Sequence, residues 1–193
     1  MLPGATKEVA MIPLSALWLP ILLSAVGVFI ASNILHMAIP AWHRGDYGKL
    51  DNEKAFLDAI ASAKSGQYIA PHVNWGKLGA EEREAMMRRP MAFALVRNPA
   101  RFSFPKTLGL YLVYLLVIST FIAYVAAVTL AAGMPFGYVF RVVGSAGILA
   151  YAFGTVSDAI WYGKPWSVVA KFVIDGVIYG LVTGAIFGWL WPH

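Results

Sequence analysis

The 193-residue chain contains no cysteine. This excludes disulfide bonds, thiolate metal sites and thiol nucleophiles, and it leaves the redox compartment undetermined. Charged side chains are also scarce, at 13% of the residues, whereas soluble domains average about 25%. Because 59% of the residues are hydrophobic, the composition is typical of an integral membrane protein.

Motifs for nucleotide binding and for the common hydrolases are missing as well. The chain has no phosphate-binding glycine loop, no nucleophile elbow and no H-E-x-x-H motif. The regularly spaced glycines near the C-terminus lie in a predicted helix with no preceding strand, which excludes a dinucleotide fingerprint. We therefore predict a protein without catalytic activity of these classes and without a nucleic-acid partner.

Four apolar runs reach the roughly 20 residues that a helix needs to cross a bilayer. They cover about residues 12–37, 107–134, 136–162 and 168–191. The last three runs are joined by very short connections, so these helices are expected to be antiparallel neighbours. The prediction is an all-α integral membrane protein. It forms a single membrane domain, 1–193, with four transmembrane helices and a partly helical cytoplasmic loop, 41–106, between helices one and two.

The distribution of basic residues predicts the orientation of these helices. Eleven of the fifteen Lys and Arg residues lie in residues 41–106. The positive-inside rule then places this loop in the cytoplasm and both termini outside, which fits the inner membrane of a bacterium. A loop of this charge is also expected to attract anionic lipid head groups.

The loop itself has a pattern that predicts structure. One helix is expected from Glu53 to Lys64, with Asn52 or Asp51 before it as a cap. A second is expected from Glu81 to Arg89, because acidic residues at its start and basic residues at its end suit the helix dipole. Residues 91–96 form an apolar run too short to span a bilayer, expected at the interface or beneath the loop helices.

A stripe of glycines stands out in the last apolar run. Residues four apart lie on one face of a helix, so such a stripe makes a groove into which another backbone can pack. A second stripe of small residues is predicted on helix three. The groove packs against a helix of the same chain, or it docks a partner subunit or another copy of the chain. The stripes consist of Gly176, Gly180, Gly184 and Gly188 on helix four and Ala146, Ala150 and Gly154 on helix three.

Histidines and a carboxylate gather near the end of helix one. His36 precedes Pro40, which frees a backbone carbonyl, and His43 is followed closely by Asp46. His72, in the middle of the loop, could fold back onto them. Three imidazoles and one carboxylate suit zinc, copper or iron. The alternative is that these residues are ordinary polar groups at the membrane interface.

Charged residues also occur inside the predicted spans, where they are costly and commonly functional. Asp158 on helix three and Lys171 on helix four are expected at similar depth, so we predict an ion pair between them. Together with Asp175 they form either a structural clamp or a path for protons or ions. Arg141 is expected to be an anchor that reaches lipid phosphates.

One stretch carries a resemblance. The sequence His36-Met-Ala-Ile-Pro-Ala-Trp-His-Arg-Gly-Asp-Tyr47, followed by Leu50-Asp-Asn-Glu53, resembles a pattern in small uncharacterised bacterial multi-pass membrane proteins. The resemblance covers helix one and the start of the loop. It implies a multi-pass membrane protein, and it implies no activity and no site.

Four functional hypotheses follow from these patterns. The first is a non-catalytic accessory subunit of a larger membrane assembly, which docks through its small-residue helix faces. The second is a metal-binding or metal-handling membrane protein. The third is a small ion- or proton-coupled transporter that works alone or as a homo-oligomer. The fourth is an intramembrane enzyme that collects anionic lipids with its basic loop.

Overall fold

The structure is a computed structural model, and it describes residues 11–97, 100 and 102–193. The chain divides into two compact units. The first consists of the described residues up to Tyr47 together with Pro105–His193, and the second consists of Gly48–Phe104. The second unit lies within residues 41–106, the segment predicted as a loop.

The first unit is built from helices. Four continuous helical stretches in the described residues are long and apolar enough to cross a membrane: Leu14–Ala38, Phe104–Thr129, Phe136–Tyr162 and Trp166–Trp189. They match the four predicted helices to within about five residues at each end. They contain the elements η1 (Leu14–Leu17), α1 (Trp18–Asn33), η2 (Ile34–Ala38), α5 (Phe104–Thr129), α6 (Phe136–Ala152), η5 (Phe153–Thr155), α7 (Val156–Tyr162) and α8 (Trp166–Trp189).

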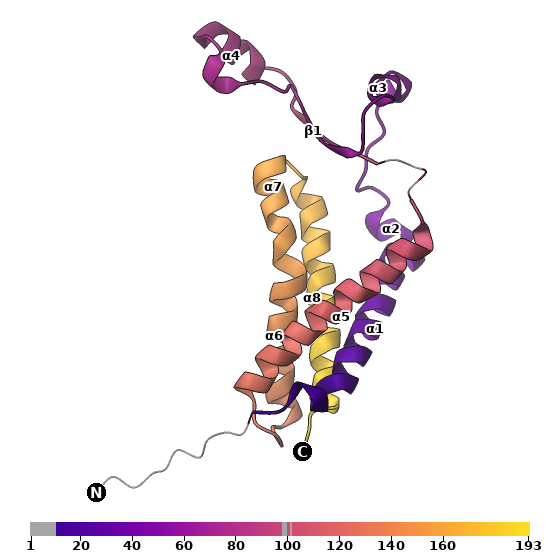
Figure 1. Cartoon of the computed structure of the whole chain (residues 1–193), viewed down its shortest axis with the longest axis vertical. Helices are drawn as coiled ribbons and strands as arrows, with labels where there is room; N and C mark the ends of the chain where they lie inside the picture. The colour runs from indigo at the N-terminus through magenta and orange to yellow at the C-terminus, as the bar shows by residue number, and fades with distance from the viewer. Residues whose placement is uncertain (1–10, 98–99, 101) are drawn as a thin grey trace, which may run out of the picture. The chain divides into compact units, whose positions relative to one another are not determined.

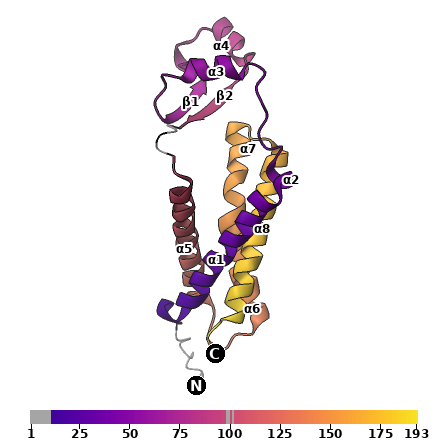
Figure 2. The same cartoon turned by 90° about the vertical axis from the view of Figure 1, so that its right-hand side faces the viewer.

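The glycine stripe of α8 packs against α6 of the same chain. A Cβ added at Gly180 would lie 2.6 Å from the backbone nitrogen of Ile148, and one at Gly176 would lie 2.5 Å from Cα of Ala152. At Gly184 it would lie 2.9 Å from a backbone oxygen of α6, and at Gly188 it would lie 2.7 Å from the ring of Phe136. The two helices run side by side in both views (Figure 1, Figure 2). The groove is therefore filled within the chain.

The stripe predicted on helix three is not the face that meets α8. The facing residues include Gly144, Gly147 and Ala152, and Gly147 approaches Gly180 closely enough that an added Cβ would lie 2.8 Å from its Cα. Ala150 is exposed, and nothing lies within 4 Å of the Cβ position of Gly154. The helical stretch 136–162 carries two stripes of small residues, and spacing alone does not say which one faces α8.

Helices α1 and α5 complete the first unit through small and polar contacts. Gly27 of α1 meets the side chains of Ile186 and Val182 where α1 crosses α8. The hydroxyls of Ser24 on α1 and Ser119 on α5 lie 2.6 Å apart and are buried. After the end of α8, the indole of Trp191 donates to the carbonyl of Ala131. This hydrogen bond ties the segment after α8 to the α5–α6 connection.

The second unit mixes helices and strands. Its elements are α3 (Glu53–Ile60), β1 (Gly66–Ala70), η3 (Trp75–Lys77), α4 (Ala80–Met87) and β2 (Ala92–Val96). The strands pair antiparallel, with Gly66 opposite Val96 and Ala70 opposite Ala92. The two predicted loop helices are confirmed, although both end earlier than expected. The prediction of a mostly helical chain is confirmed, but the second unit is not all-α, because residues 92–96 of the apolar run form strand β2.

Candidate functional site

A distorted helical turn presents His36 at the end of α1. Pro40 has no N–H, and its ring crowds the carbonyl of the residue four positions earlier, which is His36. The helix widens into the π-helical turn η2, in which the N–H of Ile39 donates to the carbonyl of Ile34 at 3.0 Å. Turns of this kind occur frequently at functional sites. Nδ1 of His36 lies 3.1 Å from the carbonyl oxygen of Ser32, so Nδ1 carries the proton and the lone pair of Nε2 is free.

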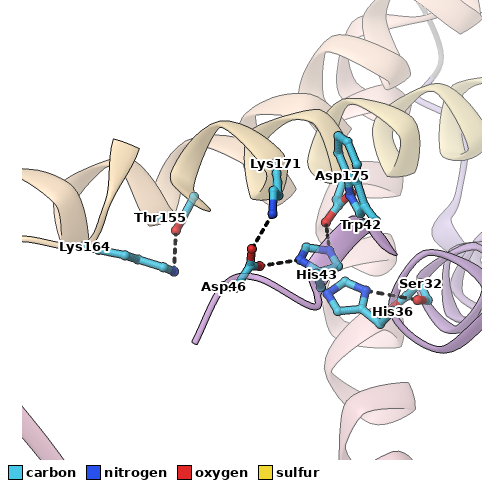
Figure 3. Close-up of polar contacts among 9 residues, drawn as sticks. All are labelled: Ser32, His36, Trp42, His43, Asp46, Thr155, Lys164, Lys171 and Asp175. Atoms are coloured by element: carbon cyan, nitrogen blue, oxygen red, sulfur yellow. Dashed lines mark hydrogen bonds and ion pairs between the residues drawn. The ribbon is translucent and has the colours of Figure 1, made fainter. Parts of the chain in front are cut away.

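His43 lies between two carboxylates. It is the last residue of the short helix α2 (Pro40–His43), which starts after the π-helical turn. Its Nδ1 lies 2.6 Å from Oδ2 of Asp46, and its Nε2 lies 2.9 Å from Oδ2 of Asp175. Figure 3 draws both contacts as dashed lines. A carboxylate accepts hydrogen bonds and a neutral imidazole has a single N–H. Each ring nitrogen of His43 therefore faces a carboxylate oxygen.

Asp175 is the deepest charge of this group. Asp175 is 1% exposed, and its Oδ1 accepts a hydrogen bond of 2.8 Å from the indole N–H of Trp42. Four residues earlier on α8, the ammonium of Lys171 donates to Oδ1 of Asp46 at 2.6 Å. Residues four apart share a helix face, so α8 holds both ends of the network. The result is a continuous chain of hydrogen bonds from Lys171 through Asp46 and His43 to Asp175.

This network corrects the predicted ion pair. Lys171 pairs with Asp46 and not with Asp158, which instead lies 3.7 Å from the ammonium of Lys164. Asp46, in the segment that follows α2, reaches the ammonium of Lys171 on α8 (Figure 3). Arg141 is exposed, with its guanidinium 5.5 Å from the ring centroid of Tyr138, and it takes no part in the site.

The pKa of Asp46 lies below its usual range. The hydrogen bond from Lys171 is the largest cause, and the hydrogen bond from His43 is the next. Burial acts in the opposite direction, because it disfavours the charged form, but its effect is smaller. Asp46 is thus held as a carboxylate, which keeps its partner His43 oriented.

The lowered pKa of Asp46 predicts how the stability of the metal-free protein depends on pH. Because the pKa of Asp46 is lower in the folded chain than in the unfolded chain, its stabilising effect is present above the usual pKa of aspartate. The effect disappears as the pH falls through the folded-state value. Thermal unfolding in detergent should show Asp46→Asn less stable than the unaltered chain near neutral pH, with the two converging in acid.

The exposed ion pair between Lys54 and Asp58 offers a control, since exposed pairs contribute little. Asp58→Asn should follow the unaltered chain at every pH. If the unfolding temperature of Asp46→Asn stays equally far below that of the unaltered chain throughout the acid range, the lowered pKa of Asp46 is contradicted.

Three possible metal ligands meet at the site. One ligand atom from each of His36, His43 and Asp175 lies within 4.8 Å of the other two. Asp46 belongs to the predicted set, but it contacts Nδ1 of His43, whereas Asp175 contacts Nε2. His72 belongs to the second unit. Sequence reasoning named Asp175 as an intramembrane charge and did not join it to the histidines, because more than 130 residues separate them along the chain.

A cavity of about 350 Å³ adjoins these groups. Such a volume lies in the usual range for small-molecule sites, about 300–1,000 Å³. The hydroxyl of Tyr111 donates to Oγ of Ser32 at 3.1 Å. The buried hydroxyls of Tyr151 and Tyr179 have no hydrogen-bond partner among the described residues. The cavity is lined by Ser32 and His36 of the first span, Tyr111 and Tyr114 of α5, Tyr151 of α6, and Phe172, Asp175 and Tyr179 of α8.

Comparison with known proteins gives no further indication. No protein-family model, no curated protein and no solved structure matches the chain.

Proposed function

We propose that this protein is a membrane protein that binds a transition-metal ion through His36, His43 and Asp175. The observation that carries the proposal is the convergence of their three ligand atoms within 4.8 Å, close to the loop end of the bundle. Two imidazoles and one carboxylate form a ligand set that suits zinc or ferrous iron, with a further position left for water or substrate.

The surroundings of each ligand support the proposal. Metal-binding imidazoles usually donate their second N–H to a carbonyl or a carboxylate, which fixes the ring and the tautomer. His36 has the carbonyl of Ser32 in this position, and His43 has the carboxylate of Asp46. The indole of Trp42 likewise holds one oxygen of Asp175.

Metal entry requires a small rearrangement of these groups. Ligand atoms around a tetrahedral zinc ion lie about 3.3 Å apart, given metal–nitrogen distances near 2.0–2.1 Å. The three atoms must therefore approach one another, and Nε2 of His43 must exchange the proton that it shares with Asp175 for the metal. Binding is thus expected to release a proton and to weaken as the pH falls.

The experiment is a metal analysis of the protein extracted from its own membrane in a mild detergent. The double variant His36→Ala and His43→Ala should lose the bound ion, whereas His193→Ala, which removes a histidine outside the site, should keep it. His72→Ala decides between ligand sets: metal loss in this variant would restore the predicted four-residue site. An unchanged metal content in the double variant would end the proposal.

The rival hypotheses differ in the support that remains for them. The accessory-subunit hypothesis rested on the small-residue helix faces, the patterned basic loop and the lack of a catalytic motif, and α6 fills the glycine groove that was one of these faces. The transporter hypothesis gains from a cavity that reaches the buried Asp175. For orientation, we infer that residues 41–106 face the cytoplasm in a bacterial inner membrane and meet anionic lipid head groups there, because most basic residues lie in this segment.

A further inference from the structure

The outer face of α1 is regular, apolar and open. The buried residues of α1 include Ser24, Val28 and Ser32, which lie on the side that meets the rest of the unit. On the opposite side, residues recur at alternating spacings of four and three, which keeps them on one face and is the spacing of a seam between two helices. Ile30 and Met37 are more than half exposed, at 54% and 61%. This outer face consists of Leu19, Leu23, Val26, Ile30, Asn33 and Met37.

Asn33 is the polar side chain of this apolar face. Its Nδ2 donates to the carbonyl oxygen of Phe29 at 2.7 Å. An amide has two N–H groups and an acceptor oxygen, and Asn33 makes no other hydrogen bond among the described residues. Asn33 lies five residues before Ala38, the last residue of the span, which is roughly 7 Å along the helix. Lipid chains offer no hydrogen bonds at this depth, whereas amide side chains there bond to other helices.

A hollow of about 420 Å³ adjoins Asn33 on the same helix. All of its lining residues belong to α1 and the π-helical turn η2, so no second helix of the described chain closes it. Side chains of one helix insert into the holes between residues of a facing helix, so the hollow suits the apolar side chains of a second helix. The hollow is lined by Phe29, Ile30, Asn33, Ile34, Met37 and Ala38.

The same helix of a second copy matches both the hollow and the amide. A lipid acyl chain fills an apolar hollow, but it forms no hydrogen bond with Asn33. Two copies in one membrane have the same orientation, so their α1 helices run parallel, and a two-fold axis between them uses the same face of both. Each Asn33 amide then donates to the other and accepts from it. A lone asparagine in an apolar seam also fixes the register of the two helices.

We propose that the protein forms a homodimer in which the outer face of α1 packs against the same face of a second copy, with the two Asn33 side chains hydrogen-bonded to each other. The proposal rests on α1 spanning a membrane, and it does not depend on the metal. One side of α1, with Ser24 and Val28, packs within the chain, and the other side, with Ile30 and Asn33, packs between copies.

Cysteine crosslinking in the membrane of the producing cells tests the proposal. Because the chain contains no cysteine, a single introduced thiol forms a disulfide only with another molecule. A disulfide requires Cα atoms within about 7 Å of each other, which residues of a tight seam satisfy. After mild oxidation, Ile30→Cys should therefore give a product of twice the 21.0 kDa chain mass.

Val113→Cys is the matched control for Ile30→Cys. Val113 is 55% exposed on α5, at a similar distance from the loop end of its span, and it should remain a single chain. Three outcomes would overturn the proposal. Equal crosslinking of the two variants would indicate random collisions, no crosslinking of Ile30→Cys would leave the face to lipid, and a product of another mass would make a different protein the occupant.

Asn33→Leu tests the amide in the Ile30→Cys background, in vesicles of uncharged lipid at several low ratios of protein to lipid. Loss of two hydrogen bonds between helices should lower the association constant at least about fivefold, as measured from the crosslinked fraction. Thr120→Val is the control, because Thr120 is an exposed polar residue of α5 whose hydroxyl likewise donates to the carbonyl four residues earlier. This variant should crosslink as the unaltered background does.

Undiminished crosslinking in Asn33→Leu would overturn the pairing of the two amides. All of these variants retain the three proposed metal ligands, so their metal content should stay normal. A failure of the dimer and a failure of the metal site are therefore distinguishable.

Discussion

Replacing Gly180 by leucine should force α8 away from α6 and destabilise the protein by several kcal/mol. A single Cβ at this position would already lie 2.6 Å from the backbone nitrogen of Ile148 and 2.9 Å from the carbonyl oxygen of Gly144. Backbone atoms cannot rotate away as a flexible side chain can. Overpacking of a core by side chains costs about 1–3 kcal/mol, and a clash with backbone on two residues is expected to exceed that range.

Thermal unfolding in detergent measures this effect, and Gly109→Leu is the matched control. Gly109 also lies in an apolar helix, but it is exposed, and nothing surrounds its Cβ position within 4 Å. Gly109→Leu should unfold close to the temperature of the unaltered chain, and Gly180→Leu far below it. Equal unfolding temperatures for the two variants would show that α6 and α8 do not pack through this face.

The sequence predicts the helices and one side of this contact well. Length and hydropathy place the four spans, because a bilayer allows few alternatives to an apolar helix of about 20 residues. The four-residue spacing identifies the α8 glycines. The face that meets α8 does not follow from spacing, because Gly147 and Gly154 both lie in stripes of small residues and only packing in three dimensions selects Gly147.

The strands of the second unit were missed for a different reason. Residues 66–70 and 92–96 stabilise each other by pairing across more than 20 intervening residues. Neither segment alternates clearly between polar and apolar side chains, which is the signal that predicts a half-buried strand. A short apolar run without that alternation does not distinguish a strand from a segment packed beneath helices.

Part of the site could be predicted because it is local in sequence. His36, His43 and Asp46 lie within eleven residues of one another, and the effect of Pro40 on the helix follows from its missing N–H. Asp175 joins them only through the crossing of α1 and α8. No spacing rule reports such a crossing, since it depends on where Gly27 allows the two helices to approach.

Lys171→Met should destabilise the protein much more than Lys164→Met. Lys171 bonds to the side chain of Asp46, which is 3% exposed, whereas Lys164 lies near Asp158, which is 44% exposed. Removing one member of a buried pair leaves an uncompensated charge and costs about 3–5 kcal/mol. The side chain of Lys171 is itself 27% exposed, so we expect a loss on the order of 2–3 kcal/mol after solvent screening.

Lys164→Met should cost less than about 1 kcal/mol, as is usual for exposed pairs. Both lysines lie near the same end of the unit and have similarly exposed side chains, at 29% and 27%, so the substitutions are matched. Unfolding in detergent near neutral pH measures both. A larger loss in Lys164→Met would restore Asp158 as the main carboxylate of this region.

The double variant Lys171→Met with Asp46→Asn separates a lost attraction from a stranded charge. An asparagine oxygen still accepts the N–H of His43, and it leaves no carboxylate without its lysine. If the cost of Lys171→Met comes from the buried charge, the second substitution should recover more than half of it. If the double variant is as unstable as the sum of the single variants, Lys171 and Asp46 act independently. In that case the chain of hydrogen bonds from Lys171 to Asp175 is not an energetic unit.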